Sequence, residues 1–461
     1  MMFRKLLALL LVFIALDGAG YFIFTRYVHL PHDHESPDAA EEFDKDYSSR
    51  PQIVDESNAY VYVAGFDAPP SVDPEDRGIA RVRRIRREME KDLFAESHEY
   101  HNNKINYFDV FSEEEHKVVQ ACLLPTDECI RLIKVQTKKD PKWIDKGALA
   151  LSRYRELFSR KKWREEIIDP PFDVGSGLSW MEVFQAQRIF HIELWVQANL
   201  GRGAVVSRNL DTELAFWRSC MQSTYNVANK VLAAAGIKNN FAWSNAIYLN
   251  KNISIVEWRN ERSLSVPVSE DERSWHRPFV GEWKGFSMLT FYSYAKGGKN
   301  IKEKIEKIMM KMRGVLAYDR MDTIYLLATD LKSTSIVLDV PYDRVVLSLN
   351  ELREKYEPRS DWNTFLALRK GNALGQSLVN DWISGVISWV GRCDDLEGAR
   401  RALVLSLSLA HADDAAIDSL VNDNQYLNPY TKLPMSLDKN KRTVEFIGIS
   451  DDKHKHFVYH Y

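Results

Sequence analysis

The sequence lacks the motifs by which many enzyme classes are recognised. Its 461 residues contain no H-E-x-x-H zinc motif, no Walker phosphate loop and no Rossmann dinucleotide fingerprint. It has no fixed-period repeat, which argues against a solenoid architecture. Its 62 basic and 65 acidic residues leave a net charge of −3, which argues against a general nucleic-acid binder. We therefore assign no catalytic residue, cofactor or metal site, and the sequence favours a non-catalytic protein over an enzyme.

Cysteine is also scarce, with four in the chain. Cys122 and Cys129 enclose a short segment with a proline and polar residues, which is typical of a turn that a disulfide closes. We predict this disulfide, the alternative being two reduced thiols that are close in sequence by chance. Cys220 and Cys393 fall in or beside apolar helical patterns, which predicts buried free thiols.

The N-terminal residues carry the clearest signal in the chain. Arg4 and Lys5 precede Leu6–Phe24, which is apolar except at Asp17. This run is close to the ~20 residues that a helix needs to cross a bilayer. We interpret residues 1–26 as a signal anchor. The alternatives are a cleaved signal peptide and a buried soluble helix.

The charges beside this run predict the orientation of the chain. Arg4 and Lys5 lie before the run, and an acidic stretch follows it. The positive-inside rule then places the N-terminus in the cytoplasm and the body across the membrane. In a bacterium, this predicts a single-pass protein of the inner membrane whose body lies in the periplasm.

Helical periodicity dominates the rest of the sequence. Apolar side chains recur at helical spacing over 179–199 and over 211–235, where Asp211 and Gly236 provide start and stop signals. With Gly201-Arg202-Gly203 between them, these runs predict an antiparallel helical hairpin. The fold class predicted is mainly α, with helical hairpins or a bundle after one N-terminal transmembrane helix and a small C-terminal β-hairpin. The predicted regions are an anchor (1–26), a tether (27–57), a helical region (58–260), an aromatic-rich connection (261–299), a second helical region (300–425) and a β-hairpin tail (426–461).

The aromatic-rich connection is the candidate binding segment. Pro267, Pro278 and several glycines interrupt its periodicity, and long connections in compact proteins are often functional. Buried aromatic side chains also concentrate binding energy when a partner covers them. We therefore predict Trp275, Trp283 and Phe286 as binding residues. The alternative is a strap that packs these rings onto the helices.

Two other groups of polar residues invite a functional interpretation. His454, His456 and His460 would share one face of a strand and could hold a transition metal, but a disordered terminus is favoured. His32-Asp33-His34-Glu35 is better explained as part of the solvated tether. The arginine cluster from Arg81 to Arg87 is followed by acidic residues, which favours a solvated helix face over an anion-binding surface.

Several short motifs resemble a known group of proteins. Asn428-Pro429-Tyr430-Thr431, Pro434-Met435 and the strand Val444–Ile449 resemble the tail D-P-F-[ST]-G-K-P-[LM] of uncharacterised, membrane-anchored helical envelope proteins of Gram-negative bacteria. The chain departs from this tail at Asn428 and at Lys432-Leu433. Further similar motifs are Asn58-Ala59-Tyr60, Gly65-Phe66-Asp67-Ala68-Pro69, Gln185-Ala186-Gln187 and Phe216-Trp217-Arg218. The resemblance implies a location and an architecture, and it brings no catalytic residues.

These observations predict a membrane-anchored, periplasmic, helical binding or scaffold protein of the cell envelope. Its expected partners are the lipid of the inner membrane, through the N-terminal helix, and a protein, with no nucleic acid. The sequence does not predict the oligomeric state. The alternatives are an immunity protein that neutralises an envelope toxin, and a hydrolase whose site is not visible in the sequence.

Overall fold

A computed structural model describes most of the chain. The described residues are 38–91, 105–166, 178–249, 253, 259, 261–292, 320–356, 373–450 and 455–461. The predicted anchor (1–26) lies outside them, as do residues 27–37 of the predicted tether and His454. Within the described residues, no helix is both long and apolar enough to cross a membrane.

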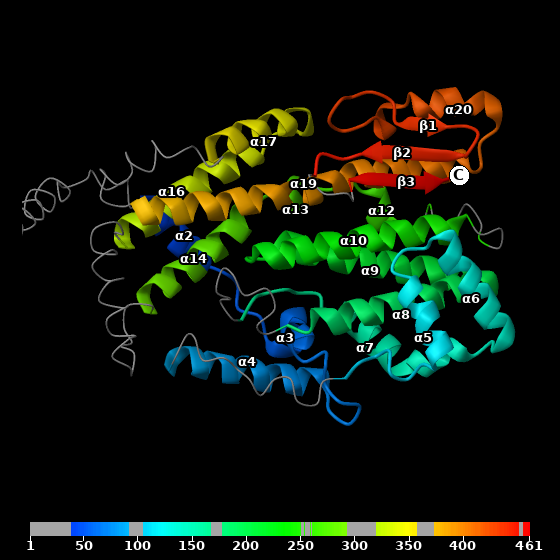
Figure 1. Cartoon of the computed structure of the whole chain (residues 1–461), viewed down its shortest axis with the longest axis horizontal. Coiled ribbons are helices and arrows are strands. Elements are labelled where there is room, and N and C mark those ends of the chain that lie inside the picture. The colour runs from blue at the N-terminus through cyan, green and yellow to red at the C-terminus, as the bar shows by residue number, and fades with distance from the viewer. Residues whose placement is uncertain are drawn as a thin grey trace, which may run out of the picture.

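The described body is mainly helical (Figure 1). The helices of its first half are α2 (Asp38–Ser48), η1 (Asp55–Ser57), α3 (Ala59–Ala64), α4 (Pro74–Lys91), α5 (Glu113–Ala121), α6 (Asp127–Lys139), η3 (Trp143–Gly147), α7 (Ala148–Ser159), α8 (Trp180–Asn199), α9 (Gly203–Ser223) and α10 (Val227–Tyr248). Those of its second half are α12 (Arg262–Ser265), α13 (Glu270–Arg273), α14 (His276–Tyr292), α16 (Arg320–Leu338), α17 (Tyr342–Tyr356), α19 (Ala373–Leu409), α20 (Asp414–Val421) and η4 (Asn424–Tyr426).

The C-terminal residues form an antiparallel sheet rather than a hairpin alone. Its strands are β1 (Ser436–Asp438), β2 (Thr443–Ile447) and β3 (His456–His460), in the order β1-β2-β3. The predicted hairpin corresponds to β1 and β2, and β3 adds a third strand, with Phe446 opposite Phe457. The disordered end favoured by the sequence is therefore wrong for β3. Its alternating pattern explains this, because Phe457 and Tyr459 are buried while His456, Val458 and His460 are exposed.

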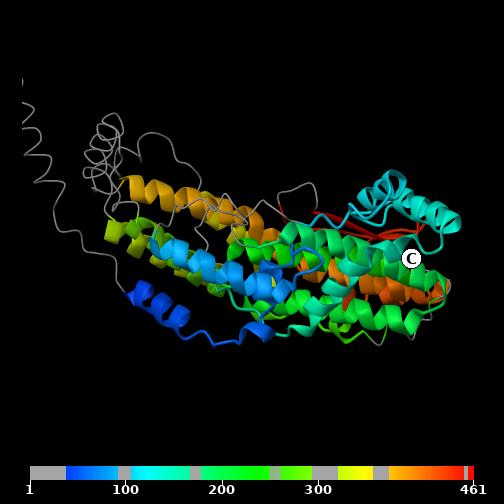
Figure 2. The same ribbon diagram turned by 90° about the horizontal axis from the view of Figure 1, so that it is seen from below.

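Helix α10 occupies the middle of the body. It packs against α9 and α19, and the sheet packs on α19, with β3 also in contact with α10 (Figure 1). Figure 2 shows α5 and α6 on one side of this body and α2 on the opposite side, at the other end. A single core cluster runs from Ala39 to Tyr459, so the two predicted helical regions share one hydrophobic core.

The predicted helix 211–235 is wrong at both ends. α9 begins at Gly203, and the chain breaks at 224–226, where the Asn226 side chain caps α10. Gly236 lies in the middle of α10 instead of ending a helix. A Cβ atom there would come within 2.4 Å of the Trp217 ring. Gly236 therefore allows α10 to pack closely on α9. In the sequence alone, a glycine needed for close packing looks the same as a glycine that ends a helix.

The predicted aromatic connection (261–299) is also wrong in structure, because its described residues are largely helical. A capping box at Ser269 starts α13, and α14 runs through Pro278. The side chains of Trp275, Trp283 and Phe286 are buried, with exposed fractions of 1%, 5% and 7%. Their rings pack into the core, as the strap alternative expects.

One arginine of the predicted solvated helix face is buried. Arg81 Nη2 donates to both oxygens of the buried Asp67, at 2.9 and 2.7 Å, and Arg77 Nε donates to Asp67 Oδ1 at 2.9 Å. Burial alone would raise the pKa of the Asp67 carboxyl, but these two guanidinium groups lower it. Arg83 and Arg87 are exposed, as predicted. The face is thus solvated only in part, because Arg81 joins α4 to the segment after α3.

Asn428 and Lys432 shape the turn that precedes the sheet. Asn428 Oδ1 accepts hydrogen bonds from the backbone N–H groups of Tyr430 and Thr431, at 2.9 and 3.3 Å, as an aspartate oxygen would. Lys432 has a φ of 58°. A non-glycine residue therefore adopts the left-handed conformation that glycine favours.

The sheet docks on α19 through a buried carboxylate. Asp395 accepts hydrogen bonds from the N–H groups of Ile449 and Ser450, at 2.7 and 3.1 Å, and from the Tyr430 hydroxyl at 2.9 Å. One turn earlier, Gly391 lets the backbone of Ser450 lie directly on the helix. A Cβ atom at Gly391 would come within 2.7 Å of the Ser450 Cα. This face of α19 thus holds Ile449 and Ser450, which follow β2.

Two glycine-to-alanine changes on α19 should therefore have opposite effects. Gly391→Ala should destabilise the protein by about 1–3 kcal/mol, because the added methyl overpacks the contact with Ser450. Gly385→Ala should stabilise it by about 0.5–1 kcal/mol, since Gly385 lies within the same helix and a Cβ atom there would meet nothing within 4 Å. Urea unfolding of both variants measures the difference. Shifts in the same direction would contradict this account of the docked tail.

Candidate functional site

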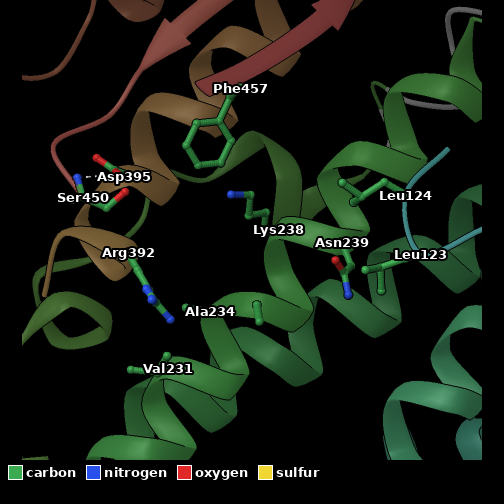
Figure 3. Close-up of a pocket in the computed structure, with 11 residues that line it drawn as sticks. Leu123, Leu124, Val231, Ala234, Lys238, Asn239, Arg392, Asp395, Ser450 and Phe457 are labelled. Carbon is green, nitrogen blue, oxygen red and sulfur yellow. Dashed lines mark hydrogen bonds between the residues drawn. The ribbon is translucent and has the colours of Figure 1, made fainter. Parts of the chain in front are cut away.

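A cleft of about 210 Å³ opens where α10, α19, the sheet and the disulfide loop meet (Figure 3). Each of these segments supplies part of its wall. The lining residues are Leu123, Leu124, Val231, Ala234, Ala235, Lys238, Asn239, Arg392, Asp395, Ser450 and Phe457. The cleft therefore joins parts of the chain that are more than 300 residues apart.

The disulfide loop forms an apolar lip of the cleft. The predicted disulfide between Cys122 and Cys129 is confirmed, and it links the end of α5 to the start of α6. The loop between these cysteines presents Leu123 and Leu124, whose exposed fractions are 54% and 37%. Opposite them, α10 contributes small and apolar side chains at Val231 and Ala234 (Figure 3).

Two cationic side chains reach toward the open space of the cleft. Lys238 extends from α10 and Arg392 from α19 (Figure 3). The Lys238 Nζ atom lies 4.4 Å from the centre of the Phe457 ring, a cation–π distance. Asp395 is the only carboxylate among the lining residues of this cleft, and its oxygens already accept from Tyr430, Ile449 and Ser450. Burial raises the pKa of this carboxyl. The described lining is therefore mostly apolar, with a few polar and charged side chains.

A polar contact fixes the strand that carries Phe457. The Asn245 side chain of α10 donates to the His460 carbonyl and accepts from the His460 N–H, each at 3.0 Å. These two hydrogen bonds satisfy the backbone N–H and C=O groups of His460 on the outer edge of β3. They also link α10 to the sheet that carries Phe457.

A second polar cluster lies in the helical core, around Glu213. This carboxylate is buried at 0% exposure and contacts His191, Tyr154, Gln187 and Asn240 at 2.7–2.9 Å. Burial would raise the pKa of the Glu213 carboxyl, but His191 and the hydrogen bonds lower it. Its oxygens are occupied by protein groups, and its partners join α7, α8, α9 and α10. The arrangement is that of a structural network rather than of a solvent-reachable acid–base pair.

A buried lysine ties α10 to α9 and α13. Lys230 Nζ donates to the carbonyls of Met221 and Glu272, at 3.1 and 2.6 Å, and lies 5.6 Å from the centre of the Trp275 ring. Burial lowers the pKa of its ammonium group. Trp275 thus has a structural role beside Lys230 and does not line the cleft.

The structure does not bring the sequence-predicted binding residues to the cleft. Trp275, Trp283 and Phe286 lie in and before α14, and none of them lines the cleft. Their role in binding remains a prediction. His456 and His460 share the exposed face of β3, as predicted for a strand. Among the described residues, no group of three or more potential ligands is arranged to hold a metal ion.

Sequence reasoning missed the residues of the cleft, and comparison with other proteins adds none. Lys238 and Arg392 lie in helices that carry several other polar and charged residues, so no local signal in the sequence marks them out. No protein-family model, curated protein or solved structure matches this chain.

The four cysteines should differ sharply in reactivity. Cys220 and Cys393 are buried free thiols, as predicted, and burial raises the pKa of both, to about 12 for Cys393. A protonated, buried thiol reacts slowly with alkylating reagents. We expect no alkylation of the native protein by iodoacetamide at pH 8. Unfolding should expose Cys220 and Cys393, and added reductant should expose Cys122 and Cys129 as well.

Peptide mass spectrometry identifies the modified positions in each state. Alkylation of Cys122 or Cys129 in the unreduced, unfolded protein would contradict the disulfide. Alkylation of Cys393 in the native protein would contradict its burial.

Proposed function

We propose that this chain is a binding protein of the cell envelope, and that it binds its ligand in the cleft between α10, α19 and the sheet. The cleft itself carries the proposal. It is concave, mostly apolar and has a few convergent polar groups, which is typical of ligand sites. Its walls come from helices, a disulfide-closed loop and a docked strand, so its shape is formed before a ligand arrives.

The buried polar groups of the core support binding over catalysis. Glu213 and His191 have the chemistry of an acid–base pair, but their exposed fractions are 0% and 1%. An acid or base must reach the proton that it transfers, directly or through one water. Glu213 instead accepts hydrogen bonds from Tyr154, Gln187 and Asn240, and these bonds join the helices.

The proposed location follows from the sequence. Residues 1–26 would anchor the chain in the inner membrane, and the charges of Arg4 and Lys5 would leave the body in the periplasm. The disulfide between Cys122 and Cys129 supports an oxidising compartment. The resemblance of the tail to envelope proteins of Gram-negative bacteria points the same way.

Site-specific photo-crosslinking in cells tests whether the cleft binds. A photoreactive phenylalanine analogue at Leu123, on the apolar lip, should capture a discrete ligand or partner. The same analogue at Val205 is a matched control, because Val205 is an apolar residue of α9 with nearly the same exposure, 53% against 54%. Equal adducts at both positions, or none at Leu123, would reject the cleft as the binding site.

A reporter fusion tests the proposed topology. Alkaline phosphatase fused after residue 100 should be active, because it folds only when it is exported. A matched fusion of a reporter that works only in the cytoplasm should be inactive at the same point. Strong activity of the cytoplasmic reporter would overturn the periplasmic location and leave the cleft experiment unaffected.

A further inference from the structure

Helix α2 is attached to the body through a narrow set of contacts. It packs on α14 and α16 (Figure 1), and its buried side chains are Ala39, Ala40 and Phe43. A helix of 11 residues is unstable in water without tertiary contacts. The helical state of α2 therefore depends on what these three apolar side chains and its polar side gain from α14 and α16.

The polar side of α2 is held by weak contacts. Acidic side chains of α2 meet basic side chains of α14 and α16 in two ion pairs and one hydrogen bond of 2.8 Å, which are Glu42–Lys332, Asp44–Lys284 and Asp46–His276 respectively. All six side chains are partly exposed, with exposed fractions between 27% and 53%. Ion pairs with such exposure contribute little each, and salt screens them. The attachment of α2 is therefore sensitive to ionic strength.

The surface beneath α2 is held together without α2. The Phe43 ring of α2 lies edge-on to the rings of His276 and Trp283, with centroids 5.7 and 5.9 Å apart. Trp283 Nε1 donates to the Ile324 carbonyl at 3.2 Å, and this bond joins α14 to α16. Trp283, which the sequence predicted as a binding residue, thus contacts a segment of its own chain. Departure of α2 would leave the pairing of α14 with α16 in place.

The chain is fastened to the body again directly after α2. Arg50 is buried, and its side chain donates to the carbonyls of Tyr47 and Glu165, at 3.1 and 3.2 Å. Its guanidinium group also lies 5.2 Å from the centre of the Tyr225 ring, a cation–π distance. Glu165 and Tyr225 belong to segments outside α14 and α16. Arg50 can therefore hold the chain while α2 is detached.

Resting on the membrane anchor proposed above, we infer that α2 is a releasable strap that sets how far the body reaches from the membrane. With α2 bound, residues 27–37 alone separate the anchor from the body, and this link spans at most about 40 Å. With α2 released and Arg50 still bound, residues 27–49 separate them and span at most about 80 Å. Release of α2 thus about doubles the distance from the membrane at which the body can meet a ligand.

Hydrogen exchange followed by mass spectrometry tests whether α2 is released separately from the rest of the body. The full chain is studied in lipid nanodiscs. Amides of α2 should exchange at least about tenfold faster than those of α10, because their opening does not require global unfolding. Raising the NaCl concentration from about 0.05 to about 0.5 M should widen this difference, since salt screens the ion pairs. Exchange of α2 at the rate of α10 under both conditions would overturn the strap.

Exchanging the charges of one ion pair tests what holds the strap. Lys332→Glu should speed exchange of α2 about fivefold, because it places a second negative charge beside Glu42. Adding Glu42→Lys restores the pair with its signs exchanged and should return the rate to that of the parent. Lys139→Glu is the matched control, because it breaks an exposed ion pair between α6 and α5. Thermal melts establish that each variant is folded. An unchanged rate in Lys332→Glu, or no recovery in the double variant, would overturn the inference.

Energy transfer to the lipid measures the reach itself. A donor dye is attached to Val54→Cys, an exposed position just after Arg50, and acceptor dyes are carried by the nanodisc lipids. The native cysteines are buried or form the disulfide, so the dye reacts at the new thiol. Transfer should be lower in Lys332→Glu than in the parent and should recover in the double variant.

The outcomes separate this inference from the proposed function. Equal transfer in the parent and in Lys332→Glu, despite faster exchange of α2, would overturn the control of reach and leave the anchor in place. Transfer that is absent from every form would show an unanchored chain, and would overturn both the proposed location and the reach. The crosslinks at Leu123 decide independently whether the cleft binds.

Discussion

The architecture around the cleft depends on one buried carboxylate, Asp395. Its hydrogen bonds to Ile449, Ser450 and Tyr430 hold the C-terminal segment on α19. Burying a charged group without such partners would be strongly unfavourable, so the tail and the helix satisfy each other. The docked sheet then places Phe457 opposite α10. A hydrogen-bonding requirement of the fold thus creates the wall of the candidate site.

Similar polar contacts join other elements of the body. Asp67 pairs with Arg81, and Gln187 donates to the buried Glu213. Arg218 binds Glu272 and the carbonyls of the segment before α13. These residues connect elements that are far apart in the chain, and they do so in the core rather than in the cleft. Their contacts support the architecture rather than line the candidate site.

Local sequence signals were sufficient where local physics decides the structure. The short Cys122–Cys129 spacing predicted the disulfide, and the apolar run of 179–199 predicted α8 almost to the residue. The alternation near the C-terminus predicted β1 and β2, because side chains on a strand have a period of two. The mainly helical architecture was predicted from apolar side chains that recur at helical spacing.

Other features depend on contacts between distant segments, which a single sequence does not display. Gly236 looked like a helix end because its Trp217 neighbour belongs to another helix. Proline and glycine in 261–299 suggested a connection, yet α14 continues through Pro278, since proline is tolerated in the first turn of a helix. The cleft was invisible for the same reason, because Leu124, Lys238 and Phe457 meet only after folding.

The contact between Asn245 and His460 has a consequence for the order of assembly. The helical pair α9 and α10 precedes β3 in the chain by about 200 residues, so it is synthesised before β3. The contact between α9 and α10 does not use β3, whereas the wall at Phe457 and the pairing at His460 require it. The wall of the cleft is therefore incomplete until β3 docks on the helices.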